Sequence, residues 1–158
     1  MNDLSHLKGT TVLVTGANGF IGSHLVDSLL SLDCNVHCLV RNSSNLRWLS
    51  SPKIQFHYVD LADPDFKIPN LPSIGFVFHC AGLTKARNRD EYFDINSRVC
   101  TTLYEQCFAY KESIKGIVHL SSLAAAGPGK DGVLVDEATT LNPITFYGQS
   151  KKAGEEVA

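Results

Sequence analysis

The segment TVLVTGANGFIG, residues 11–22, decides how the rest of the chain is interpreted. It begins with Val12–Val14, an apolar, mostly β-branched run typical of a buried parallel strand. Three glycines follow at a spacing of three, Gly16, Gly19 and Gly22, and the amphipathic segment Ile21–Leu32 is expected to be a helix. A sharp turn from strand to helix directs backbone N–H groups and the helix dipole at one point, where an anion is favoured.

Glycine suits such a turn because a side chain would keep a pyrophosphate from the backbone or block the packing of helix on strand. The alternative is a glycine-rich turn that binds no ligand. Because a strand precedes the glycines and a helix follows them, the segment predicts a dinucleotide-binding turn.

Size and composition are those of one globular domain. The 158 residues can bury a core, and a hydrophobic fraction of 44% is ordinary. The formal net charge is −2 with no basic stretch, so neither nucleic acid nor a membrane is expected as a partner. No apolar run could span a bilayer, the first eight residues lack the apolar region of a signal peptide, and the five cysteines include no CxxC pair. We therefore expect a cytoplasmic protein.

Cys34, His37 and Cys38 are spaced closely enough to suggest metal ligands. They lie in or beside a predicted strand, where neighbouring side chains point to opposite faces. A shared metal ion is therefore not expected.

Strand and helix patterns alternate along the chain. Beyond the first strand and helix, we expect strands at 36–40, 54–59, 76–80 and 117–120. Residues 43–52 are expected to form a short helix, the proline-containing stretch 62–73 an irregular crossover, and 90–111 a long helix. A loop of small residues at 124–132 precedes a last helix that begins near residue 144. The pattern predicts an α/β fold with a doubly wound parallel sheet, which is Rossmann-like.

The end of the second strand bears on the choice of cofactor. An acidic residue there commonly binds the adenosine ribose 2′-hydroxyl. This chain has Val40 and Arg41 at that place, and no carboxylate lies between Arg41 and Asp60. A guanidinium with neighbouring hydroxyls suits a 2′-phosphate, so we expect NADP in preference to NAD. The alternative is that Arg41 is a solvated loop residue. Asp60 either accepts a hydrogen bond from the adenine amino group or caps the next turn.

The reactive residues are expected near the C-terminal end. Tyr147 and Lys151 are four residues apart and share one face of the last helix. Ser122 follows the strand at 117–120, on the sheet edge where open α/β folds bind ligands. A tyrosine phenol has a pKa near 10, and a neighbouring ammonium favours the phenolate. Tyr147 is therefore the expected acid/base, Lys151 the group that lowers its pKa, and Ser122 the substrate-orienting residue, with Ser121 as the alternative.

These motifs together resemble the extended short-chain dehydrogenase/reductase family, the NAD(P)-dependent epimerase/dehydratase group. The residues that carry the resemblance are TGANGFIG at 15–22, Asp60-Leu61, HCAG at 79–82, Ser121-Ser122 with Gly127-Pro128, and YGQSK at 147–151. The resemblance implies a structural role for Asn96 within its helix. It also implies cofactor binding by a set spread over the chain: Gly16, Gly19, Phe20, Ile21, Gly22, Arg41, Asp60, Leu61, Ala81, Gly82, Tyr147 and Lys151.

The resemblance implies a reaction by hydride transfer on a nucleotide sugar or a related small alcohol or carbonyl. At position 126, where an aromatic residue is frequent, this chain has alanine, and in this respect it resembles the hydroxysteroid dehydrogenase and flavonol reductase branch. An NADP-dependent reductase is therefore an alternative. A non-catalytic protein that senses NAD(P) is a second alternative. We expect residues 1–158 to be the cofactor-binding part of a longer protein, without its substrate-binding portion and inactive alone. Family members often form homodimers, and the helix at 90–111 is a candidate contact.

Overall fold

The computed structural model describes residues 4–129 and 134–158. The last part of the expected small-residue loop, residues 130–132, lies outside this description. The chain divides into two compact units. The first contains the residues up to Ala81 together with Glu105–Leu120, and the second contains Gly82–Tyr104 and Ser121–Ala158.

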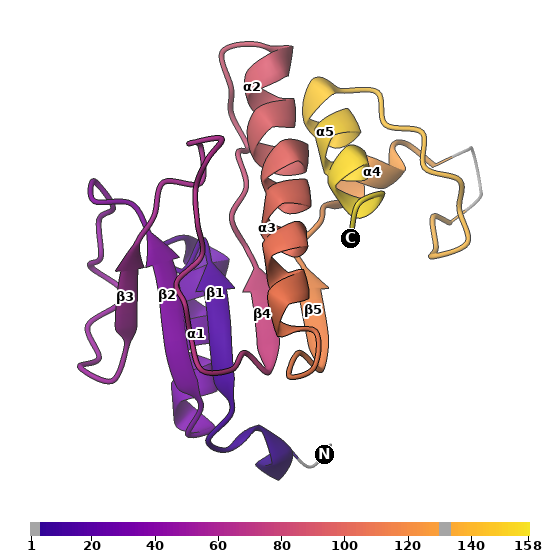
Figure 1. Cartoon of the computed structure of the whole chain (residues 1–158). Coiled ribbons are helices and arrows are strands. Elements are labelled where there is room, and N and C mark those ends of the chain that lie inside the picture. The colour runs from indigo at the N-terminus through magenta and orange to yellow at the C-terminus, as the bar shows by residue number, and fades with distance from the viewer. Residues whose placement is uncertain (1–3, 130–133) are drawn as a thin grey trace. The chain divides into compact units, whose positions relative to one another are not determined.

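The first unit contains a parallel sheet of five strands (Figure 1). In chain order these are β1 (Thr11–Thr15), β2 (Asn35–Val40), β3 (Gln55–Tyr58), β4 (Phe76–His79) and β5 (Gly116–His119). Their order across the sheet is β3-β2-β1-β4-β5, so the chain crosses from one half to the other after β3. This order and the parallel pairing confirm the predicted Rossmann-like α/β class.

Helix α1 (Phe20–Ser31) packs on one face of this sheet (Figure 1). Val14 pairs in register with Cys38 on one side and Phe78 on the other, so alternate residues of the central strands share a face. The core on this face contains fully buried residues of β1, of the turn that follows it, and of α1 and β2, namely Val12, Val14, Ala17, Val26, Val36 and Cys38. It fixes the turn between β1 and α1 at the carboxyl end of the strands.

The prediction of a short helix at 43–52 was wrong. The segment forms turns, because its polar side chains bond to nearby backbone groups, which competes with helix formation. The Asn45 side chain accepts from the N–H of Arg47, and the Ser44 hydroxyl accepts from the N–H of Arg41. The crossover at 62–73 is irregular, as predicted, and buries Phe66 and Leu71.

The predicted long helix is a run of three segments: α2 (Arg89–Phe93), the π-helical η2 (Asp94–Arg98) and α3 (Val99–Cys107). A 3₁₀ turn at Phe108–Tyr110 follows it, and another 3₁₀ turn, Ser5–Leu7, precedes β1. The apolar periodicity predicts the run but carries no signal for the π-helical segment.

Two further helices belong to the second unit. A short α4 (Leu123–Ala126) replaces the first part of the expected loop, because the Ser122 side chain caps it by accepting from the N–H of Ala124. The last helix, α5 (Phe146–Glu155), begins two residues later than expected, where Thr145 caps it through the N–H of Gly148. Among the described residues, no helix is both long and apolar enough to cross a membrane.

Candidate functional site

The glycine turn of the first unit is closed by backbone packed on backbone. Gly16 has a φ of +65°, and a Cβ there would lie 2.5 Å from the N atom of Ala81, at the end of β4. A Cβ on Gly22 would lie 2.2 Å from the carbonyl oxygen of Gly16. Both positions therefore exclude any side chain. The missing side chain of Gly22 lets α1 pack closely on the turn that follows the strand, which is one of the two reasons for which glycine was expected in this turn.

The N-terminus of α1 is open to an anion. Gly19 occupies the cap position without a side chain, and the first turn holds no acidic residue. Phe20 and Ile21, which follow the cap, are 70% and 54% exposed. The first N–H groups of a helix have no partner within the helix, so they are available to a ligand here. These donors fit the pyrophosphate of a dinucleotide.

Thr15 and His79 fix the strand ends that border this turn, and neither was predicted as a site residue. The Thr15 hydroxyl lies 2.7 Å from His79 Nδ1 and accepts from the N–H of Ala81 at 3.2 Å. Thr15 and His79 are both fully buried. Their bonds hold the end of β4 beside Gly16. The motifs around both residues were recognised, but the contact joins positions 64 residues apart.

Arg41, Asp60 and Leu61 follow β2 and β3. Arg41 is exposed and begins a tight turn, in which the N–H of Ser44 donates to its carbonyl oxygen at 2.9 Å. One carboxylate oxygen of Asp60 accepts from the N–H of Ala62 at 3.0 Å, so Asp60 caps its own turn. This bond agrees with the capping alternative. Adenine contact by Asp60 or Leu61 stays a prediction.

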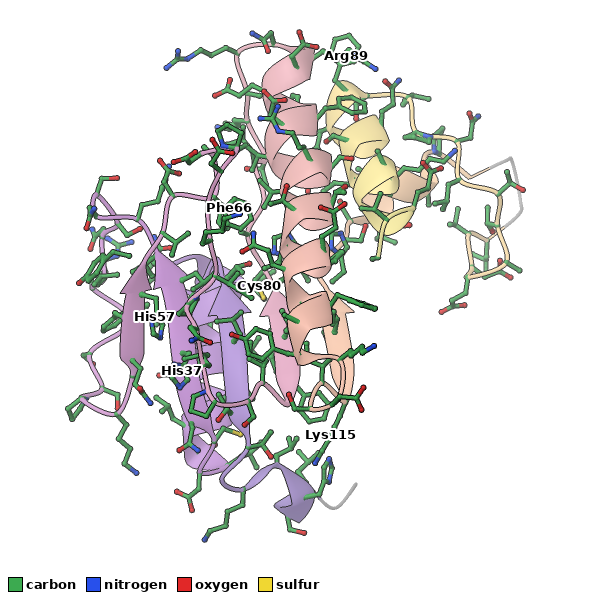
Figure 2. The ribbon with its side chains drawn as sticks, in the orientation of Figure 1. His37, His57, Phe66, Cys80, Arg89 and Lys115 are labelled. Carbon is green, nitrogen blue, oxygen red and sulfur yellow. The ribbon has the colours of Figure 1, made fainter. Side chains whose placement is uncertain are left out.

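A histidine pair joins β2 to β3 in the same sheet (Figure 2). The Nδ1 atom of His37 lies 2.8 Å from Nε2 of His57, and the two rings are stacked. Burial lowers the pKa of both histidines, and the charge of His57 lowers that of His37 further. Cys38 lies in the core with its pKa raised to about 12 by burial, so strand alternation separates it from His37.

The expected acid/base pair lies on α5 in the second unit. Lys151 is 3% exposed, and Tyr147, one turn earlier, is half-buried. The ring of Tyr147 lies 6.0 Å from that of Tyr92 on α2. A Cβ added to Gly82 would be 3.7 Å from Lys151 Nζ, so the Gly82 backbone borders the buried ammonium. The structure thus brings Lys151 next to Gly82 and places Tyr147 one turn before Lys151 on the same helix.

Ser122 and Ser121 differ in what their hydroxyls do. Ser121 Oγ donates to a carboxylate oxygen of Glu155. Ser122 Oγ serves as an acceptor in capping α4, which leaves its hydroxyl hydrogen for another oxygen. Helix α4 packs closely on α5, because a Cβ on Gly148 would lie 2.2 Å from the carbonyl oxygen of Ala124. Ser122 therefore starts a helix that contacts the Tyr147 turn directly.

Asn96, in the π-helical η2, is 1% exposed and uses its whole amide group. Its Oδ1 accepts from the N–H of Leu83 at 2.7 Å. Its Nδ2 donates to the Leu83 carbonyl oxygen and to Ser150 Oγ, both at 3.0 Å. These bonds accord with the expected structural role of Asn96. Burial raises the pKa of nearby Cys100 to about 11, and the charge of Lys151 opposes this rise.

The parallel sheet, whose strand order reverses beside β1, and the open glycine turn before α1 are typical of Rossmann-type dinucleotide-binding proteins. The model of the NAD dependent epimerase/dehydratase family matches residues 12–158. The chain belongs to this family, whose members include NAD-dependent epimerases, dehydratases and dehydrogenases.

Relatives of several activities are similar to the chain. A Methanocaldococcus jannaschii protein with the provisional name UDP-glucose 4-epimerase is 35% identical, over 92% of this chain and 48% of that protein. Sterol demethylase protein B of Methylococcus capsulatus is 30% identical, over 92% of this chain and 45% of its own length. The mouse sterol-4-alpha-carboxylate 3-dehydrogenase (decarboxylating) is 28% identical, over 95% of this chain and 40% of that protein. The chain spans about half the length of the curated relatives it matches.

Solved structures agree with this assignment. A UDP-galactose 4-epimerase has a TM-score of 0.78 at 29% identity, covering 93% of this chain and 50% of that one. MoeE5, solved in complex with UDP-glucose and NAD, has a TM-score of 0.73 at 32% identity, covering 94% of this chain and 48% of that one.

Proposed function

We propose that the protein catalyses hydride transfer on a nucleotide sugar or a related alcohol or carbonyl, with Ser122, Tyr147 and Lys151 as its catalytic residues. The observation that carries this proposal is the arrangement around α5. Lys151 is buried one turn from Tyr147, and Gly148 brings α4, with Ser122 at its start, against the same helix. Family membership and the epimerase relatives support the nucleotide sugar as substrate.

In this proposal, Tyr147 moves the proton. Its phenolate takes the proton of a substrate hydroxyl as the carbon gives up hydride, and its phenol returns a proton when a carbonyl is reduced. The Lys151 ammonium favours the phenolate and binds the ribose hydroxyls of the cofactor. Ser122 donates its hydroxyl hydrogen to the substrate oxygen. The bound nicotinamide supplies the hydride acceptor. The glycine turn binds the pyrophosphate, with Ala81 and Gly82 allowing close approach of the backbone.

A reductase or dehydrogenase acting on a steroid or flavonol-like substrate is the second candidate. It is supported by the sterol-processing relatives and by Ala126, which precedes Gly127 where an aromatic residue is frequent in the sugar epimerases. This reaction would use the same three residues but leave reduced or oxidised cofactor as a net product. An epimerase returns the hydride, so its cofactor shows no net change.

The experiment is to incubate the full-length protein with UDP-glucose, UDP-galactose and a 3-hydroxysteroid, each with NAD or NADP. Chromatography detects the sugar epimer, and nicotinamide absorbance detects net oxidation. Tyr147→Phe is expected to lower turnover by about 10³-fold while cofactor affinity changes little. Tyr58→Phe, an exposed tyrosine on β3, is the control. Full activity in Tyr147→Phe would contradict the proposal, and cofactor binding without turnover of any substrate would favour a non-catalytic NAD(P) sensor.

We also propose that NADP is preferred to NAD. The exposed Arg41 guanidinium at the end of β2, with Asn42 and Ser43 in the same turn, supports a 2′-phosphate contact. The NAD bound in the MoeE5 structure makes NAD the alternative. Arg41→Ala is expected to weaken the binding of NADPH by about tenfold and to change the binding of NADH little, since one charge-assisted hydrogen bond contributes about 1.5 kcal/mol. Nicotinamide fluorescence measures both affinities, and equal weakening would overturn the preference.

We propose that the full-length protein is a homodimer that uses the helical run at 89–107. Sedimentation analysis tests the oligomeric state. Exchange of an exposed residue of this run, such as Arg98→Glu, should then shift the protein toward monomer.

A further inference from the structure

Ser150 lies between Tyr147 and Lys151 in sequence, yet it belongs to neither the acid/base pair nor the substrate contact. Its side chain is fully buried. The hydroxyl donates to the carbonyl oxygen of Tyr147 at 2.7 Å and accepts from Asn96 Nδ2 at 3.0 Å. A hydroxyl has a single hydrogen, so donation to Tyr147 leaves Ser150 an acceptor toward Asn96, as the amide requires.

The bond from Asn96 distinguishes this serine from an ordinary helical serine. Serine hydroxyls commonly bond to a carbonyl in the preceding turn, as Ser23 does with the carbonyl oxygen of Phe20 at 3.0 Å. Such a bond is local to one helix. At Ser150 the same hydroxyl also receives a bond from η2, and the amide that gives it is bonded to both backbone groups of Leu83.

The result is a continuous chain of hydrogen bonds from Leu83 through Asn96 and Ser150 to the backbone of Tyr147, with its middle bond, from Asn96 to Ser150, fully buried and the others part-buried. Every side-chain polar group of Asn96 and Ser150 has a partner in this chain, and away from water such bonds resist displacement more than they would on the surface. The first turn of α5, which carries Tyr147, is thereby fixed relative to the segment that follows Gly82, beside Lys151.

We propose that Ser150 is a positioning residue, which sets where the Tyr147 phenol lies relative to the Lys151 ammonium. This role rests on the proposed function, because it assumes that Tyr147 transfers the proton. Loss of the hydroxyl leaves Asn96 Nδ2 with one partner fewer and frees the Tyr147 turn to shift. A displacement of a few tenths of an ångström at a catalytic group changes its efficiency, and here it would weaken the stabilisation of the phenolate.

The test needs no knowledge of the substrate. The full-length protein is saturated with oxidised cofactor, NADP⁺ and NAD⁺ in parallel, and the ultraviolet absorbance of tyrosine phenolate is followed against pH. Subtracting the curve of Tyr147→Phe isolates the contribution of Tyr147. Ser150→Ala should move the midpoint of this contribution upward by about one pH unit, a tenfold loss of phenolate stabilisation.

Two further variants complete the design. Ser150→Cys keeps a side chain of similar shape that is a weaker donor and acceptor, so it should move the midpoint in the same direction by a smaller amount. If Ser150→Ala fails to fold, Ser150→Cys still tests the proposal. Ser23→Ala is the matched control, because Ser23 is also buried and bonded three residues back, but it lacks a bond from Asn96. It should leave the midpoint unchanged.

An unchanged midpoint in both Ser150 variants, or an equal shift in Ser23→Ala, would overturn the positioning role while the proposed function stands. An ordinary phenol midpoint, near pH 10, in the parent protein would instead contradict the assignment of Tyr147 and Lys151, and with it the role of Ser150.

Discussion

The glycine turn of the first unit and the cluster of Asn96, Leu83 and Ser150 in the second each hold a segment of the proposed site in place, but by opposite means. In the turn, backbone touches backbone: the missing Cβ of Gly16 would lie 2.5 Å from the N atom of Ala81. In the cluster, one buried amide makes three hydrogen bonds to groups distant in sequence. The turn therefore fails when an atom is added, whereas the cluster fails when a donor or acceptor is removed.

The largest effect is expected for Gly16→Ala. The new Cβ would overlap the β4 end, and the φ of +65° is unfavourable for alanine, so the unfolding free energy should fall by about 3 kcal/mol or more, with loss of cofactor binding. Gly9→Ala is the matched control, because Gly9 has a φ of +71° but nothing within 4 Å of its Cβ position. Only the conformational cost, about 1 kcal/mol, should appear there. Urea unfolding measures both, and equal losses would contradict the role of close packing.

Removal of the amide in Asn96→Ala is expected to have the next largest effect. The variant leaves the N–H and C=O of the half-buried Leu83 and the buried Ser150 hydroxyl without this partner, so the unfolding free energy should fall by about 2 kcal/mol. Asn88→Ala removes an exposed cap bond to the N–H of Glu91 and should cost about 1 kcal/mol. If urea unfolding gives the smaller loss for Asn96→Ala, the cluster does not depend on its amide.

The smallest effect concerns the histidine pair on β2 and β3, where the first unit itself relies on a polar contact. Burial holds the pKa of His37 and His57 below 6.5, the value in the unfolded chain. As the pH falls, these two histidines therefore take up protons at a higher pH in the unfolded chain than in the folded one. The unfolding free energy that the neutral pair maintains above pH 6.5 is lost progressively below that pH.

Urea unfolding between pH 7.5 and 5 should show a falling unfolding free energy, and His57→Gln, which cannot titrate, should reduce the slope. His24→Gln, an exposed histidine on α1, is the control and should leave the slope as it is. A slope unaffected by His57→Gln would show that the pair contributes nothing to the acid sensitivity.

The features that could be predicted from the sequence have short-range patterns. The apolar runs predict all five strands, the three glycines predict the turn into α1, and the four-residue spacing places Tyr147 and Lys151 on one face of α5. The incorrect helix at 43–52 shows the limit of such patterns, since serine and asparagine side chains there bond to their own backbone instead. The π-helical η2 left no trace in the periodicity.

By itself, then, the sequence determined the α/β class, the strand-to-helix turn and the Tyr-x-x-x-Lys pair, because each depends on residues a few positions apart. Only the tertiary structure decided which groups meet: Thr15 with His79, Asn96 with Leu83 and Ser150, and Gly148 with Ala124. These contacts join residues 13 to 64 positions apart, and no local spacing specifies them. A buried polar atom finds its partner only when the elements that carry both have packed, which is why the sequence alone does not indicate the positioning role proposed for Ser150.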